Sequence, residues 1–114
     1  MSVKLSFRQV GDVNVVDVAG RITLGEGSSA LRDALRDMVG KNQKKILLNL
    51  ADVSYIDSSG IGELVSGFTT VTNNGGQLKL LNLTKRVKDL LQITKLYTVF
   101  DVHDDEAAAV RSFA

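Results

Sequence analysis

The sequence predicts an α/β fold, with a mixed, mostly parallel central sheet of about five strands, an N-terminal antiparallel hairpin and about four helices. Two strand-like segments at the N-terminus are separated only by Gly11 and Asp12, a spacing typical of a hairpin. After them, segments with helical periodicity alternate with apolar strand-like runs, which favours right-handed crossovers between parallel strands. The 114 residues contain no repeat or linker, so we expect a single domain over residues 1–114.

The first half of the chain supplies the hairpin, one helix and a central strand. Residues 3–8 alternate between apolar and polar side chains, and residues 13–19 form a second strand-like run that Gly20 closes. A glycine-containing connection at residues 21–27 leads into a segment with apolar residues at helical spacing, which Gly40 is expected to end. Residues 46–50 are almost continuously apolar, which predicts a strand covered on both faces.

The second half continues the alternation. Residues 61–71 show helical spacing of apolar side chains before the Asn-Asn-Gly-Gly sequence at residues 73–76. A strand is expected at residues 78–83, followed by a helix for which Thr84 is a suitable N-cap. Residues 99–102 predict a short last strand, and Asp104 is expected to open a C-terminal helix.

Composition argues against several classes of function. The formal net charge is +1 and no basic cluster is denser than residues 85–88, so we expect no nucleic-acid partner. The chain has no cysteine, which excludes disulfides and thiolate chemistry. Its apolar runs are too short for a membrane span and its N-terminus lacks the apolar core of a signal peptide. We therefore expect a cytoplasmic protein with no membrane partner.

Motifs for catalysis are missing as well. His103 is the only histidine, and it stands beside acidic residues without a G-x-S-x-G sequence elsewhere. Gly60 and Gly62 have no lysine after them, unlike the glycines of a phosphate-binding P-loop. The sequence therefore predicts no enzymatic activity, no catalytic residue, no metal and no cofactor.

The most informative segment lies between the central strand and the following helix. Asp57, Ser58 and Ser59 are three consecutive residues that can cap a helix, although one cap suffices. Gly60 and Gly62 are expected to thin the side-chain cover around them. A helix N-terminus favours added negative charge, so a serine here is either a cap or an acceptor of phosphate.

Residues 49–62, Asn-Leu-Ala-Asp-Val-Ser-Tyr-Ile-Asp-Ser-Ser-Gly-Ile-Gly, together with the order of elements, resemble the STAS family. This family comprises domains of sulfate transporters and of anti-sigma factor antagonists, and the chain is most similar to the bacterial antagonists. Further similarity lies in residues 18–22, 75–80, 87–91 and 94–96 and in Phe100, so that the resemblance covers essentially the whole chain.

The resemblance implies a partner-switching role. The unphosphorylated antagonist would bind an anti-sigma factor that is also a serine kinase, and would thereby release the sigma factor. Ser58 would be the phosphorylation site, and a serine phosphatase would reset the switch. The partner-binding residues would be Asp57, Ser58, Ser59, Gly60, Ile61 and Gly62. We expect a monomer or weak dimer.

Three alternatives remain open from the sequence. The first is a role in a signalling assembly whose target is not a sigma factor, as in some members of the family. A two-component receiver domain would use Asp57 as its phosphate acceptor, but the acidic pair and the lysine of receivers are missing. A small-ligand or nucleotide-binding module would hold an anion with the N–H groups around Gly60 and Gly62.

Overall fold

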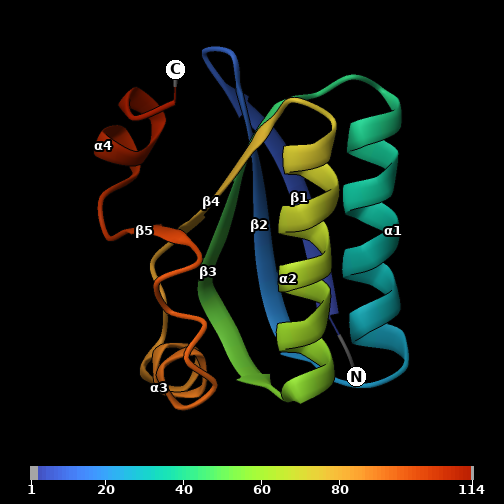
Figure 1. Cartoon of the computed structure of the whole chain (residues 1–114), viewed down its shortest axis with the longest axis vertical. Coiled ribbons are helices and arrows are strands. Elements are labelled where there is room, and N and C mark those ends of the chain that lie inside the picture. The colour runs from blue at the N-terminus through green and yellow to red at the C-terminus, as the bar shows by residue number, and fades with distance from the viewer. Residues whose placement is uncertain (1–2, 114) are drawn as a thin grey trace.

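The structure is a computed structural model that describes residues 3–113, in which strands and helices alternate after an initial hairpin (Figure 1). The sequence-predicted fold class is confirmed. The elements are β1 (Val3–Val10), β2 (Val13–Ile22), α1 (Glu26–Gly40), β3 (Lys45–Ile56), α2 (Ser58–Asn73), β4 (Gln77–Leu81), α3 (Lys85–Ile93), β5 (Asp101–His103) and α4 (Glu106–Arg111).

The strands form one sheet in the order β1-β2-β3-β4-β5. β1 pairs with β2 antiparallel, and each later neighbour pairs in parallel. Parallel neighbours require a crossover, and α1, α2 and α3 provide the three crossovers of this sheet. Figure 1 shows α1 and α2 side by side against the sheet, with α3 and α4 on the opposite side of the view.

Side chains alternate along each strand, and this divides the core in two. Val16 and Val18 of β2 belong to the larger cluster, which also includes buried residues of α1, α2 and α3. Val13 and Val15 point the other way, into a smaller cluster closed by Ala109 of α4 and by the C-terminal Phe113. The sheet is therefore buried on both faces where α4 covers it.

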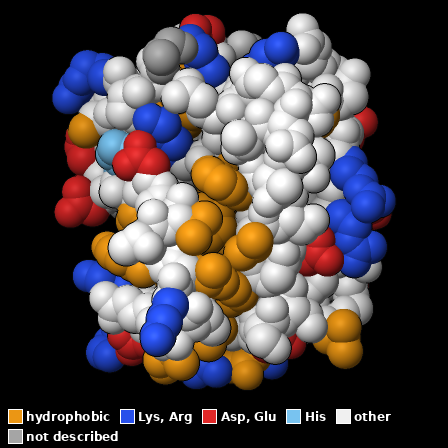
Figure 2. All heavy atoms as spheres, in the orientation of Figure 1, with side chains coloured by type: hydrophobic (Ala, Val, Ile, Leu, Met, Phe, Trp, Pro, Cys, Tyr) orange, Lys and Arg blue, Asp and Glu red, His pale blue; other side chains and the backbone are white. Residues whose placement is uncertain are grey.

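An apolar seam joins α2 to the chain between α3 and β5. Figure 2 shows apolar side chains gathered along this seam. Phe68 of α2 contacts Phe100 edge to face with ring centroids 5.4 Å apart. Val99, which is 40 % exposed, lies beside Phe68 in the same groove. These contacts fix the C-terminal third of the chain to the helix that begins at Ser58.

β3 is longer than the sequence predicts. Its hydrogen-bonded register with β2 continues to the pair Ile22–Ile56, with irregular steps between Asp17 and Ala19 and between Gly20 and Arg21. Such bulges shift the alternation of apolar and polar positions, which hides a strand from periodicity analysis. Residues 51–56, which were expected to be part of a loop, therefore continue β3 and its pairing with β2 up to the start of α2.

Other boundaries also shift by a few residues. The final helix is capped by the side chain of Asp105, which accepts a hydrogen bond from the Ala108 N–H, and not by Asp104 as expected. β4 ends at Leu81 because Asn82 has a φ of 58°, which leaves the strand conformation. β5 begins at Asp101, after a turn over residues that were expected to be extended.

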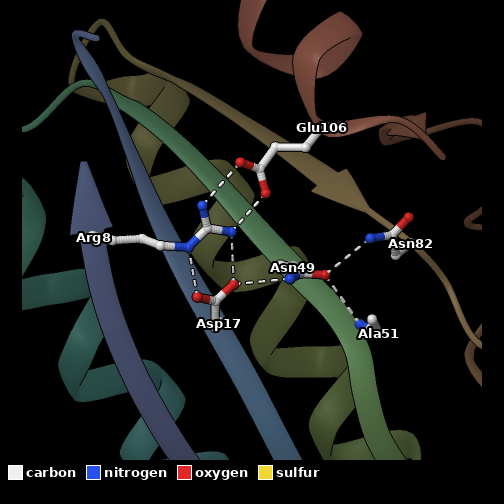
Figure 3. A network of polar contacts seen from close by, with 6 residues as sticks. All are labelled: Arg8, Asp17, Asn49, Ala51, Asn82 and Glu106. Carbon is white, nitrogen blue, oxygen red and sulfur yellow. Dashed lines mark hydrogen bonds and ion pairs between the residues drawn. The ribbon is translucent and has the colours of Figure 1, made fainter. Parts of the chain in front are cut away.

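A polar network ties three strands to α4 (Figure 3). The guanidinium group of Arg8 in β1 donates to Asp17 Oδ2 at 2.7 Å and to Glu106 Oε1 at 2.6 Å. Asn49 of β3 donates to Asp17 Oδ1 at 2.8 Å and accepts a bond from Asn82 at 3.3 Å. These contacts anchor the first turn of α4 to the sheet beside the smaller core.

Candidate functional site

The candidate site lies where β3 passes into α2, with Asp57 as the only residue between them. In Figure 1 the start of α2 stands next to the carboxyl end of β3 and the start of α1. The backbone N–H of Asp57 donates to the carbonyl oxygen of Ile22 at 3.3 Å, which extends the β2–β3 ladder by one more bond. The first residue of α2, Ser58, therefore directly follows the paired end of β3.

Asp57 caps α2 and holds the neighbouring loop. Its Oδ1 accepts a hydrogen bond from the Gly60 N–H at 2.9 Å, as an N-cap residue does. Its Oδ2 accepts a second one from the Leu24 N–H at 3.1 Å. One carboxylate thus joins the start of α2 to the connection between β2 and α1.

These bonds set the charge state of Asp57. Partial burial alone would raise the pKa of this carboxyl, but the N–H groups of Gly60, Leu24 and Ser59 outweigh it and hold the pKa below its usual value. The carboxylate is therefore ionised at neutral pH, directly beside Ser58.

Ser58 and Ser59 are not needed as caps, because Asp57 supplies the cap. The side chain of Ser58 is exposed and that of Ser59 is half-buried. Within residues 3–113, neither hydroxyl makes a hydrogen bond. The Ser58 hydroxyl is thus open to solvent at the first position of the helix.

The next three residues, Gly60, Ile61 and Gly62, differ in their burial and in the space around them. Gly60 and Ile61 are buried, and a Cβ on Gly60 would lie 2.4 Å from the Ile22 carbonyl oxygen, so Gly60 lets α2 approach β2. Gly62 is exposed, and a Cβ there would meet nothing within 4 Å. Only Gly62 therefore thins the outer side-chain cover, whereas both glycines were expected to do so.

The loop at residues 21–27 borders the site through well-defined contacts. Gly25 has a φ of 98°, and a Cβ on Gly27 would lie 2.5 Å from the Arg21 carbonyl oxygen. Ser28 closes the loop with its hydroxyl, which donates to the Thr23 carbonyl at 2.9 Å. The side chain of Leu24 is 79 % exposed at the tip. The two glycines were the sequence signal for this tight turn.

A stack of three side chains that the sequence did not reveal lies close by. The Arg86 Cζ lies 3.9 Å from the centroid of the Tyr55 ring, and the Arg21 Cζ lies 4.7 Å from it. Arg21 and Tyr55 are partners in the β2–β3 register, and Arg86 is in the first turn of α3. Their meeting depends on this register, which only the fold defines.

His103 lies outside this site. Its Nε2 is 3.2 Å from Asp101 Oδ2 and 3.4 Å from the Ser112 Oγ, so both contacts involve the same ring nitrogen. A Ser-His-Asp relay uses one nitrogen for each partner.

No group of metal-ligating side chains is present within residues 3–113. None of the helices in this part of the chain has the length and apolarity needed to cross a membrane.

Comparison with known proteins shows the family of this chain. The family model described as the STAS domain matches residues 4–109. The anti-sigma-B factor antagonist of Bacillus subtilis is 33 % identical over 102 residues, which cover 90 % of this chain and 92 % of that protein. The anti-sigma F factor antagonist of Paenibacillus polymyxa is 22 % identical and covers 96 % of this chain and 94 % of its own length.

Solved structures share the fold. The anti-sigma factor antagonist from Mycobacterium paratuberculosis superimposes with a TM-score of 0.83 at 17 % identity, covering 97 % of this chain and 93 % of that one. The Bacillus cell fate determinant SpoIIAA in its phosphorylated form gives a TM-score of 0.73 at 19 % identity, covering 95 % and 98 %. The antiparallel β1–β2 pair and the strand order also differ from the doubly wound sheet of receiver domains. The chain belongs to the STAS domain family.

Proposed function

We propose that the chain is an anti-sigma factor antagonist whose unphosphorylated form binds an anti-sigma factor with serine kinase activity, and that phosphorylation of Ser58 ends this complex. The observation that carries the proposal is the exposed, unbonded hydroxyl of Ser58 beside a helix cap that Asp57 supplies. The names of the relatives from Bacillus subtilis and Paenibacillus polymyxa support the antagonist role. SpoIIAA has been solved in both unphosphorylated and phosphorylated forms, which supports the switch.

The electrostatics of the site explain how one phosphate acts as a switch. The group adds a charge of about −1.5 to −2 at neutral pH. In the free protein the start of α2 favours this charge, so the fold tolerates it. Within an interface, the phosphate would stand next to the Asp57 carboxylate and lose its hydration. Each loss of about 1.4 kcal/mol weakens binding tenfold, so a few kcal/mol suffice to separate the partners.

Exposure favours Ser58 over Ser59 as the acceptor. The hydroxyl of Ser58 is at the surface, whereas Ser59 is half-buried behind it. A kinase must bring the γ-phosphate of ATP in line with the attacking oxygen, which the outer serine allows without unwinding the helix. The proposal includes a serine phosphatase for the reverse step, a cytoplasmic location and a binding role, without catalysis, for this chain.

The first test locates the phosphate. The chain is incubated with its cognate anti-sigma kinase and Mg-ATP, and the modified residue is identified by mass spectrometry. We expect phosphate on Ser58 in the wild type, undiminished labelling of Ser59→Ala, and none of Ser58→Ala. Labelling that persists in Ser58→Ala at the wild-type rate would refute the assignment.

The second test measures binding by calorimetry. Ser58→Ala should bind the anti-sigma factor as the wild type does, because it only removes an unbonded hydroxyl. Ser58→Glu should bind at least about tenfold more weakly, because it places a second carboxylate beside Asp57. Ser66→Glu is the control, since Ser66 is exposed on the same helix two turns further on. Equal affinities of Ser58→Glu and Ser66→Glu would contradict the switch.

A further inference from the structure

Two arginines near the site carry charge that the fold does not neutralise. Arg21 and Arg86 both stack on Tyr55, and within residues 3–113 neither guanidinium group has an ion pair. By contrast, Arg8 binds Asp17 and Glu106, and Arg32 binds Glu63 at 3.0 Å. Two like charges held at one ring repel each other, and a carboxylate from outside would relieve this repulsion.

The two segments that carry these arginines also carry exposed apolar side chains. Arg86 also lines a surface groove of about 480 Å³ along α3, where Ile93 is 76 % exposed. In this groove Lys85 is already paired with Asp89 at 2.7 Å, so Arg86 is its unpaired cation within the described chain. On the side of the loop at residues 21–27, Leu24 is 79 % exposed.

This mixture indicates the chemistry of the occupant. Free phosphate or nucleic acid would use the arginines but would leave Ile93 and Leu24 in water. Interfaces between proteins combine arginine with apolar side chains at their centre. A protein segment that carries carboxylates beside apolar side chains would satisfy both kinds of group.

The stack is also continuous with the candidate switch. Tyr55 stands two residues before Asp57 in the chain, and the Leu24 N–H is bonded to the Asp57 carboxylate at 3.1 Å. One partner that covers Ser58 would therefore extend onto the stack. The arrangement also holds the arginines in place, because the Tyr55 ring fixes both guanidinium groups.

We infer that Arg21, Tyr55 and Arg86, with Leu24 and Ile93 beside them, form a second contact with the anti-sigma factor, and that this contact recognises an acidic and partly apolar segment of that partner. The inference rests on the proposed function and adds to it a site that selects the partner independently of Ser58. We call these five residues the arginine patch.

The experiment measures the affinity of the purified cognate anti-sigma factor at about 0.05 and 0.5 M NaCl, where the Debye length falls several-fold. Arg86→Glu and Arg21→Glu should each weaken binding about tenfold at low salt, and less at high salt, because the lost attraction is screened. Ile93→Ser should weaken binding equally at both salt concentrations. Arg36→Glu is the matched control, because Arg36 is exposed on α1, across α2 from α3.

Variants of Tyr55 test whether the ring positions the charges. Tyr55→Phe keeps the aromatic face and should bind as the wild type does, whereas Tyr55→Leu keeps both arginines but not the ring and should bind about threefold to tenfold more weakly. Thermal melting of each variant verifies that the fold is retained. If a variant melts at a lower temperature than the wild type, the double variant Arg21→Gln/Arg86→Gln takes its place, because it leaves the ring intact.

The outcomes separate this inference from the proposed function. If the patch variants bind like Arg36→Glu at both salt concentrations while Ser58→Glu loses affinity, the patch is overturned and the switch stands. If Ser58→Glu keeps full affinity while the patch variants lose it, the switch fails and the patch stands. If the wild type does not bind the anti-sigma factor, both are overturned.

Discussion

At the scale of single residues, Asp57 has two structural roles. Its carboxylate caps α2 through the Gly60 N–H and holds the Leu24 N–H of the adjacent loop. It is also the charge that a phosphate on Ser58 would face. The same side chain therefore builds the surface and, under the proposed function, makes it sensitive to a phosphate, so its removal should affect stability and the proposed switch together.

Asp57→Asn should lower stability at neutral pH by about 1 kcal/mol, because an amide carries no charge and its single oxygen cannot accept from both the Gly60 and the Leu24 N–H. The pKa of Asp57 is depressed in the fold, so the stability from its ionised form is complete above the unfolded pKa of about 4 and is lost as the pH falls further. Urea unfolding of both proteins from pH 7 to pH 2 measures this. Two curves that stay parallel through the acid range would show that the charge of Asp57 does not contribute.

Among the elements, α2 depends on two glycines with opposite surroundings. Gly60→Ala would place a methyl group 2.4 Å from the Ile22 carbonyl oxygen and 2.6 Å from Ile56 Cγ1. We expect a destabilisation of about 1–3 kcal/mol, because α2 must move away from β2. Gly62→Ala, with open space around its Cβ, should stabilise the helix by up to about 1 kcal/mol. Thermal unfolding of the two variants distinguishes them, and equal effects would contradict the packing described.

The same element shows how far sequence reasoning extends. Helical spacing of residues such as Leu64 and Val71 predicts α2, because both side chains must reach the core. The end of β3 was missed, because exposed Asp52 and Ser54 break the apolar pattern while the backbone continues its ladder. The cap of α3, Thr84, was predicted correctly, whereas the cap of α4 was placed one residue early, because Asp104 and Asp105 are adjacent and both can cap a helix.

For the site, local motifs could be predicted and long-range contacts could not. The resemblance of residues 49–62 to the family pointed to the segment around Ser58. The bond from Leu24 to Asp57 and the stack on Tyr55 join residues more than thirty positions apart. These contacts depend on strand register and helix placement, about which neither spacing nor composition carries information.

At the scale of the whole molecule, the network around Arg8 connects the N-terminal hairpin to α4. Hydrogen bonds from Arg8 lower the pKa values of both Asp17 and Glu106, so these carboxylates are ionised partners at neutral pH. All three side chains are about one-third exposed, so water and salt screen the attraction. The network should therefore position α4 more than it stabilises the fold.

Arg8→Gln should cost about 1 kcal/mol of unfolding free energy at low salt, and less at high salt. Because both carboxyl pKa values are lowered in the fold, the advantage of the wild type is present above about pH 4 and is lost as the pH falls. Urea titrations at pH 7 and pH 3 measure the difference, with Lys4→Gln as the control on the same strand. An undiminished difference at pH 3 would rule out the ion pairs as its source.

The bond between Asp57 and the loop tip has a further consequence for the kinetics of recognition. Because the loop and the start of α2 are joined before any partner arrives, association requires little ordering of the backbone, and preorganised surfaces keep more of their contact energy as affinity. A single added charge then meets a rigid surface that cannot rearrange to accommodate it. Under the proposed function, a phosphate on Ser58 should therefore act chiefly by shortening the lifetime of the complex, so that release is fast without any remodelling of this chain.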